Sequence, residues 1–298
     1  MRFDPNYVQN LSQAISTASA SEQKLTAQLA SGSRVSTLSD DPVAASANAL
    51  LANSISHIDA FVQSAGKEQS LLQVTDSTLG EVVTHVTSAL SLAVSAANGT
   101  LNAANRTAIA QQVSDLRDSI VSLANTSYQG KYLFSGTQGT TQPFTQNNAT
   151  TPATTTYNGD GITTSITTPE GLKVQTNLAG SAVFQAPGAN LLASLNQLVT
   201  DIASGSSAGV SADTAAVTTA LENVSSQRSV LGSSLNRLNA TSSYAQTQQV
   251  TLQAQQSSLL SADPATVATD LKSVEVQRQA LLSVVASVNQ TNLFNYIK

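Results

Sequence analysis

The chain has 298 residues, of which 41% are hydrophobic, only 4% are aromatic and only 10% are charged. Its 13 Lys and Arg residues stand against 18 Asp and Glu residues, which gives a formal net charge of -5. Binding to a phosphate backbone requires a basic surface, so we expect no nucleic-acid partner. The absence of cysteine excludes disulfide bonds, thiolate metal ligands and cysteine nucleophiles.

At the start of the chain we expect no export signal of the cleaved type. Residues 1–6 read MRFDPN and lack the apolar run of a secretory signal peptide. No uninterrupted run of 18 apolar residues occurs, so we expect no membrane insertion. If the protein leaves the cytoplasm, we expect a route that removes no signal peptide.

The two ends of the chain predict long amphipathic helices. Asp4-Pro5, Asp41-Pro42 and Asp263-Pro264 each indicate a helix start, because Asp caps free backbone N–H groups and Pro suits the first helical position. Residues that recur at spacings of three and four form one seam on each helix. In the first helix these are Val8, Leu11, Ile15, Glu22, Leu25 and Leu29. In the last helix they are Leu271, Val274, Arg278, Leu281, Val285 and Val288.

The seams predict how the end helices pair. If they run antiparallel and residue i faces residue 300 minus i, Ile15 faces Val285 and Glu22 faces Arg278. We therefore predict a Glu22–Arg278 contact, although two separate solvent-facing charges remain an alternative. A two-stranded seam of this size is marginal against the backbone entropy of ordering more than fifty residues. We expect the pair to be stabilised by neighbouring copies of the chain.

The middle of the chain predicts further helices around an inserted β-rich segment. Helical stripes cover residues 42–98, 102–128, 190–202 and 217–259. The first stripe includes Val62, Val83 and Leu90, and the last carries Arg228 and Gln256 at polar seam positions. Residues 131–188 are instead rich in Gly and Pro, with short runs typical of strands at residues 154–157, 162–166 and 172–175. The expected fold is mainly α: a long antiparallel helical rod or coiled coil built from both chain ends, with a small β-rich inserted domain. We divide it into a terminal coiled coil (1–38 with 264–298), a helical rod (39–130 with 189–263) and an outer insertion (131–188).

Catalytic signatures are weak or missing. Ser21 and Lys24 match the Ser-x-x-Lys pattern of some acyl-transfer enzymes, but the match is expected by accident in a serine-rich chain without companion motifs. The two histidines, His57 and His85, lie 28 residues apart within one predicted helix, too far to share a metal ion. We therefore expect no enzyme, no cofactor and no metal.

Residues 29–42 read LASGSRVSTLSDDP and resemble the signature that follows the first helix in the flagellin superfamily. The residues that carry the resemblance are Gly32, Arg34, Asp40, Asp41 and Pro42. The resemblance implies a structural subunit of the bacterial flagellum with no catalytic site. It also implies that residues 1–35 and 265–298 form an inner assembly coil and that residues 32–42 form a hinge to the rod.

Two shorter segments resemble the hook–filament junction group more than filament flagellins. They are GKYLFSGT at residues 130–137 and NLFNYIK at the end of the chain. This resemblance implies an extracellular adaptor that joins hook to filament after export without a cleaved signal peptide. Its implied partners are neighbouring copies, the first hook-associated protein, flagellin and an export chaperone. A filament flagellin, or a self-contained coiled-coil adhesin or secretion-tip protein, remains an alternative.

Overall fold

The computed structural model describes the backbone of residues 5–98 and 101–296, and the side chains of residues 6–98 and 101–287. Long helices dominate and the strands lie in the middle of the chain, which confirms the expected fold class. The chain divides into two compact units, Met1–Ser56 with Gln248–Lys298 (unit 1) and His57–Thr247 (unit 2). The finer three-part division of the chain stays a prediction.

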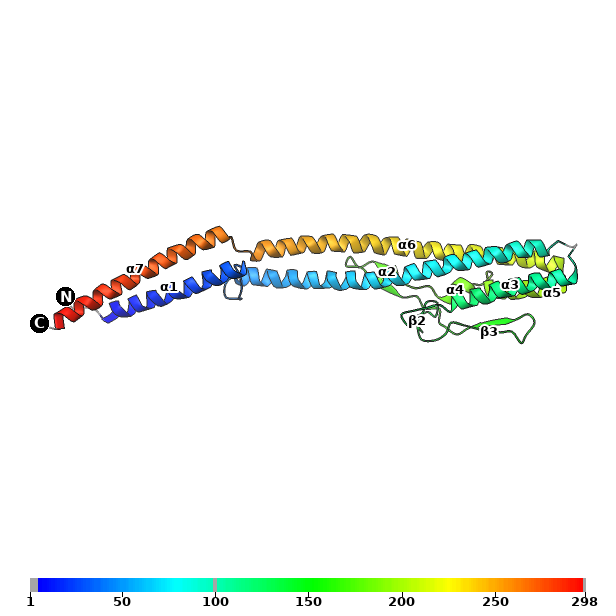
Figure 1. Ribbon diagram of the computed structural model, residues 1–298, viewed down its shortest axis with the longest axis horizontal. Helices are drawn as coiled ribbons and strands as arrows, with labels where there is room; N and C mark the ends of the chain where they lie inside the picture. Colours follow the sequence, from blue (N-terminus) through cyan, green and yellow to red (C-terminus); the bar gives the residue numbers. More distant parts are fainter. Residues whose placement is uncertain (1–4, 99–100, 297–298) are drawn as a thin grey trace. The chain divides into compact units, whose positions relative to one another are not determined.

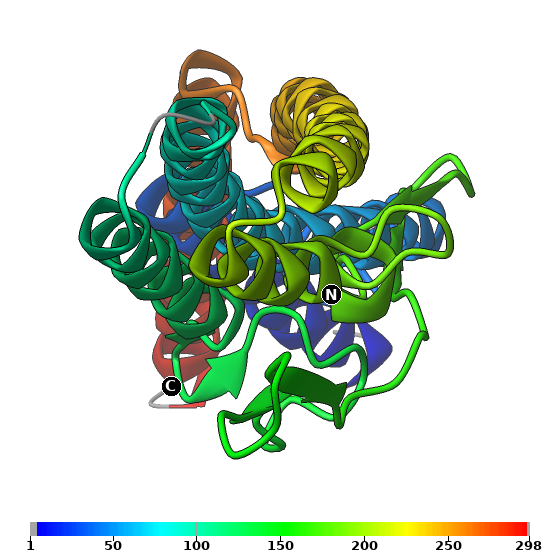
Figure 2. The same ribbon diagram turned by 90° about the vertical axis from the view of Figure 1, so that its right-hand side faces the viewer.

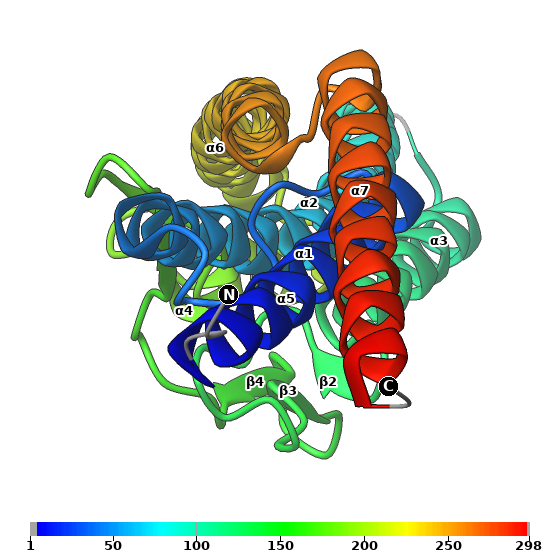
Figure 3. The ribbon, with the colours of Figure 1, turned by 90° about the vertical axis from the view of Figure 1, so that its left-hand side faces the viewer.

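Unit 1 is built on a pair of helices from the two ends of the chain. Helix α1 (Pro5–Ser31) packs along helix α7 (Pro264–Tyr296), and Figures 1 and 3 show α1 in blue beside α7 in orange and red. The unit also contains the start of α2 (Pro42–Ala96) and the end of α6 (Ser207–Leu260). The predicted pairing of the chain ends is therefore present.

Aspartate caps start the helices as expected. Asp41 Oδ1 accepts from the backbone N–H of Ala44 at 3.0 Å before α2, and Asp263 Oδ1 accepts from that of Ala265 at 3.0 Å before α7. Helix α1 ends where Gly32 takes a φ of 67°, a left-handed conformation that glycine adopts without steric cost. The predicted cap at residue 4 lies outside the part of the chain that the structure describes.

The core of unit 2 lies among α2, α3 (Ala103–Ala124), α5 (Leu191–Ser204) and α6. The fully or nearly fully buried apolar side chains of α2 recur at steps of three, four or seven residues: Ile58, Phe61, Ala65, Leu72, Leu79, Val82, Val86, Ala89 and Ala93. The sequence stripe had placed Val62, Val83 and Leu90 in this row, and these three are only half-buried. The buried residue is in each case the preceding one, namely Phe61, Val82 and Ala89. A strict heptad repeat buries these positions because it keeps one narrow seam of the helix facing inward.

The β-rich insertion consists of three separate two-stranded antiparallel ladders. They pair β1 (Ser127–Tyr128) with β2 (Lys131–Tyr132), β3 (Phe144–Asn147) with β4 (Thr154–Tyr157), and β5 (Ser165–Thr167) with β6 (Lys173–Gln175). A short helix, α4 (Gly180–Phe184), follows them. The predicted run 154–157 is strand β4, and the predicted runs 162–166 and 172–175 overlap strands β5 and β6. Strands β1 to β3 and helix α4 were not predicted.

An aromatic cluster supplies the core of this insertion. The rings of Phe134 and Phe184 meet edge to face with centroids 5.2 Å apart, and Phe144 meets Phe184 in the same way at 5.4 Å. All three side chains are fully buried. Such pairs add about 0.5–1.5 kcal/mol each beyond the burial of their area, which helps short ladders to hold together.

Helix α2 has an 18-residue window with a mean hydropathy of 1.3, and one third of that window is buried. By length and composition alone it could cross a membrane, as could no other helix in the described ranges. The core helix of a soluble protein passes the same test, and α2 carries the buried heptad row of unit 2. The expected absence of membrane insertion stays a prediction.

Candidate assembly interface

The two seam charges of α1 and α7 meet. Arg278 Nε lies 2.8 Å from Glu22 Oε2, and Arg278 Nη2 donates to Glu22 Oε1 at 3.4 Å. The side chain of Glu22 is 25% exposed and that of Arg278 is 37% exposed, so solvent screens the pair only in part. The predicted contact is therefore present, and the register in which residue i faces residue 300 minus i holds at this level of the pair.

The seam around this ion pair is only half covered. On α1, the seam residues Leu11, Ile15, Glu22 and Leu25 are half-buried, whereas Val8 and Leu29 are exposed. On α7, the half-buried seam residues are Leu271, Val274, Arg278, Leu281 and Val285. The prediction for Val288 lies outside the side chains that the structure describes. The seam thus keeps its expected spacing, while its role in assembly stays a prediction.

Other apolar side chains of the helical pair face solvent. The exposed large residues outside the seam are Tyr7 on α1 and Val276, Leu282 and Val284 on α7. Among the described side chains of α1 and α7, only Ala18 and Val267 are fully buried apolar residues. The pair therefore presents apolar surface that its own two helices do not cover.

The signature loop, residues 32–41, is held against the break between α6 and α7. The backbone N–H of Arg34 donates to the carbonyl of Leu260 at 2.7 Å, and that of Ala262 donates to the carbonyl of Gly32 at 2.9 Å. The side-chain amide of Gln28 donates to the carbonyl of Arg34 at 2.9 Å. The loop is thus tied by backbone hydrogen bonds across the two chain segments, and its expected hinge role stays a prediction.

Asp40 organises this loop from within. Its carboxylate pairs with Lys24 Nζ at 2.8 Å and accepts from the backbone N–H groups of Ser36 at 3.0 Å and Thr37 at 2.9 Å. The Lys24 ammonium first, and then these hydrogen bonds, hold the pKa of Asp40 far below its usual range. The sequence singled out Asp40 as part of the signature and Lys24 only as part of an accidental Ser-x-x-Lys match, so it did not predict that the two side chains pair.

Asp41 both caps α2 and pairs with the signature arginine. The cap to Ala44 lowers the pKa of Asp41 most, and Arg34 Nη1, 3.0 Å from Asp41 Oδ2, lowers it further. Pro42 then starts α2. The structure therefore brings the predicted signature residues Gly32, Arg34, Asp40, Asp41 and Pro42 together in one hydrogen-bonded segment.

Two polar contacts join α2 to α6. Arg228 donates from Nε to Asp76 Oδ1 at 2.7 Å and from Nη2 to Asp76 Oδ2 at 3.1 Å, and Gln256 Nε2 donates to Asn48 Oδ1 at 2.7 Å. In each contact the residue numbers of the two partners sum to 304. The two contacts lie 28 residues, or four heptads, apart along each helix. The polar heptad positions Arg228 and Gln256 signalled such contacts, but the sequence did not identify their partners.

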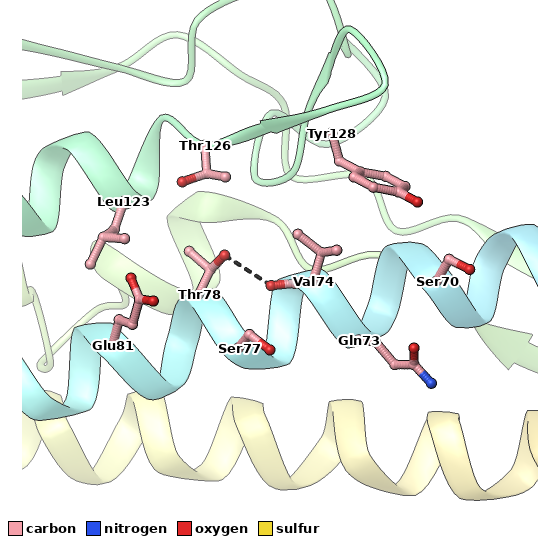
Figure 4. A pocket seen from close by; sticks show the side chains of 9 residues that line it. All are labelled: Ser70, Gln73, Val74, Ser77, Thr78, Glu81, Leu123, Thr126 and Tyr128. Carbon is pink, nitrogen blue, oxygen red and sulfur yellow. Dashed lines mark hydrogen bonds between the residues drawn. The ribbon is translucent and has the colours of Figure 1, made fainter.

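No catalytic constellation accompanies these contacts in the described part of the chain. A groove of about 570 Å³ lies between α2 and the segment from the end of α3 to β1. Figure 4 shows its lining, which consists of hydroxyl and amide side chains, the apolar Val74 and Leu123, and one carboxylate, Glu81. The described residues include no group of three or more His, Cys, Asp or Glu that could hold a metal ion.

The helical regions match known sequence families. Residues 6–139 match the bacterial flagellin N-terminal helical region, and residues 214–297 match the bacterial flagellin C-terminal helical region. Together these regions cover most of the chain, including both end helices and the signature loop. The chain belongs to the bacterial flagellin family.

Within this family, two similar curated proteins are named flagellar hook-associated protein 3. The chain is 32% identical to that of Escherichia coli (strain K12) over 149 residues, 49% of this chain and 47% of the relative. It is 33% identical to that of Salmonella typhimurium (strain LT2) over 141 residues, 47% of this chain and 44% of the relative. The chain thus spans about half the length of these relatives in the match.

Solved structures share the fold. A putative flagellar hook-associated protein from Vibrio parahaemolyticus has a TM-score of 0.68 at 22% identity, covering 74% of this chain and 100% of that one. FlgL from Xanthomonas campestris has a TM-score of 0.62 at 17% identity, covering 69% of this chain and 99% of that one. At these identities the likeness concerns the fold alone.

Proposed function

We propose that this chain is a structural adaptor subunit of the bacterial flagellum that joins the hook to the filament. The observation that carries the proposal is its identity of 32% and 33% to two hook-associated proteins 3. Its match to polar flagellin F of Vibrio parahaemolyticus is weaker, 28% over 113 residues, 38% of this chain and 30% of that protein. Filament flagellin is therefore the second candidate.

In this proposal the subunit assembles through α1 and α7, whose apolar side chains are only partly covered within one chain. Its partners are neighbouring copies, the first hook-associated protein on the hook side and flagellin on the filament side. An export chaperone accompanies it before export without a cleaved signal peptide, and it acts outside the cell. It performs no catalysis, since its task is to join two tubes and pass torque between them.

Seeded assembly separates the two flagellar candidates. Purified chain is added to short filament fragments and to hooks that carry the first hook-associated protein, and the products are measured by electron microscopy. An adaptor adds a short layer to the hooks and then stops, even with chain in excess. Continuous growth into long filaments would instead identify a filament flagellin.

Surface variants test whether α7 makes the contacts. Val276→Ser and Leu282→Ser change exposed side chains, so we expect less than about 0.5 kcal/mol of effect on the isolated chain but a loss of layer formation. Val94→Ser is the matched control, since Val94 is even more exposed than these two residues but lies on α2. Equal assembly by all three variants would remove α7 from the proposed interface.

Limited proteolysis tests the remaining alternative, a self-contained coiled-coil adhesin or secretion-tip protein. The partly covered pair α1–α7 should be trimmed first, and a resistant product close to residues 40–265 should remain. A pair that resists cleavage as firmly as unit 2 would be stable without neighbours. That result would favour the self-contained coiled coil over the adaptor.

A further inference from the structure

Two carboxyl groups meet at the turn between α5 and α6, within unit 2. Asp201 lies in the last turn of α5, and Gly205, with a φ of 79°, reverses the chain. Helix α6 then begins at Ser207 and carries Asp213 in its second turn. Figure 2 looks towards this turn, where α5 leads back into α6.

The backbone of α6 brings the two groups together. At Gly209 a β-carbon would lie 2.3 Å from Asp201 Oδ2 and 2.7 Å from its Cγ, so the carboxyl group rests against α6 where glycine leaves room. Asp213 follows Gly209 by four residues, and side chains at that spacing share one face of a helix. Asp213 is hydrogen-bonded to Asp201. Because an ionised carboxylate only accepts hydrogen bonds, this bond requires a proton on one of the two groups.

Asp213 is the group that favours the protonated form. The residue is only 9% exposed, and its Oδ2 atom is buried without a hydrogen-bond partner. An ionised carboxylate in that position loses its hydration without replacement. Burial first, and then the hydrogen bond with Asp201 and the negative charge of Asp201, raises the pKa of Asp213 to about 6.

The two arginines of α3 do not neutralise the pair. Arg106 packs at the same turn beside Gly205 and donates from Nη1 to a backbone carbonyl at 2.8 Å. Arg117 forms its ion pair with Asp118, at 2.8 Å. Among the described residues, no Lys, Arg or His nitrogen lies within ion-pair distance of either carboxyl group at the turn.

The other elements around Asp213 bring no further charge. Helix α6 carries no other titratable side chain before Glu222, and α2 carries none after His85. Among the residues that line the groove between α5 and β4, Asp213 is the only titratable one. The ionisation of Asp213 is therefore coupled to Asp201 rather than to a cation.

We propose that Asp201 and Asp213 form a pH-sensitive contact that holds α5 to α6 while the two carboxyl groups share a proton and loosens when both are ionised. Raising the pH releases the proton to water, which breaks the hydrogen bond and leaves two negative charges against each other. The inference does not depend on a role at the hook–filament junction.

The direction of the effect follows from the two states of Asp213. Its pKa in the folded chain, about 6, lies above the value of about 4 in the unfolded chain. The contribution of the contact to stability is therefore complete below about pH 4 and is lost as the pH rises through about 6. We expect the α5–α6 turn to be held more firmly in mild acid than at neutral pH.

Thermal unfolding of the full chain at pH 4.5 and pH 7.5 tests the proposal. Asp213→Asn mimics the protonated carboxyl group at both pH values, because its amide donates to Asp201 and carries no charge. At pH 7.5 we expect it to raise the Tm of unit 2 by about 3–8 °C, and at pH 4.5 by about a third as much. Glu222→Gln, at an exposed position of the same helix, is the control and should have the same effect at both pH values. A pH-independent effect of Asp213→Asn would overturn the proposal.

Two measurements on the wild-type chain decide the case if Asp213→Asn folds poorly. Carboxyl NMR of the chain labelled with ¹³C-aspartate should show one group that titrates near pH 6, with a lower midpoint in Asp201→Asn because the neighbouring negative charge is gone. Hydrogen exchange of residues 201–213, corrected for the intrinsic rate, should show protection that falls at least about tenfold between pH 4.5 and pH 7.5. Titration of every aspartate below about pH 5, or unchanged protection, would overturn the proposal.

Discussion

Reversing the charges of Glu22 and Arg278, one at a time and then together, tests whether their ion pair sets the register of α1 and α7. The closest nitrogen–oxygen distance is 2.8 Å, and the two side chains are 25% and 37% exposed. Opposite charges about 4 Å apart attract by about 1 kcal/mol in water and about 4 kcal/mol at an effective dielectric constant of 20. Desolvation and side-chain ordering offset much of this, which leaves about 1 kcal/mol for a partly exposed pair.

Each single reversal replaces this attraction with repulsion, so Glu22→Arg or Arg278→Glu should lower the opening free energy of the pair by about 1–2 kcal/mol. Amide hydrogen exchange of α1 and α7, followed by mass spectrometry on the full chain, should then be about 5–30 times faster. The double reversal restores opposite charges and should return exchange to within about 0.5 kcal/mol of the original.

Lys272→Glu is the matched control for this experiment. It reverses a charge on the same helix, but Lys272 pairs with Glu275 on α7 itself rather than with α1. We expect its exchange rates to stay close to those of the original chain. If the double reversal exchanges as fast as either single variant, the ion pair does not fix the register and the reasoning fails.

Three further predictions concern the buried row, the α2–α6 contact and the signature loop. Leu79→Ala, at a fully buried position, should destabilise unit 2 by about 2–5 kcal/mol in urea unfolding, and a smaller loss would mean that the helices close the cavity. Arg228→Lys keeps the charge but loses the two-pronged geometry towards Asp76, so the urea midpoint should fall while the slope is unchanged; no fall would show that charge alone suffices. The pKa of Asp40 is lower in the folded chain than in the unfolded chain. The contribution of its carboxylate to stability is therefore complete above the unfolded pKa of about 4 and is lost as the pH falls towards the folded pKa. The protection factor of the Thr37 amide should therefore decrease below about pH 4, and Asp40→Asn should remove that pH dependence.

Heptad spacing made the end helices predictable. The half-buried residues of α7 recur at the seam positions expected from the sequence, and the Glu22–Arg278 contact follows from the same arithmetic. The same spacing could not predict that Val8 and Leu29 are exposed, because a periodic pattern identifies one face of a helix but not what covers that face.

The insertion was harder to predict because its order comes from contacts distant in sequence. Strand β4 was predicted from its β-branched run, whereas β1 and β2 are two residues long and form no pattern of their own. The cluster of Phe134, Phe144 and Phe184 joins three segments of the insertion, and single aromatic residues do not announce their partners. The pairing of Lys24 with Asp40 was missed for the same reason.

The uneven burial of the two units gives a physical reason for the proposed assembly through the chain ends. Unit 2 has a continuous row of fully buried side chains, so its helices gain their hydrophobic stabilisation within one chain. The pair α1–α7 leaves Tyr7, Leu29, Val276 and Leu282 exposed, and fully burying one large apolar side chain contributes about 1.5–3 kcal/mol. That gain is available to the pair only against another surface, while its ion pair and tied loop already select one register. We therefore expect a subunit whose end helices find their partners within the chain but reach full stability only beside neighbouring subunits.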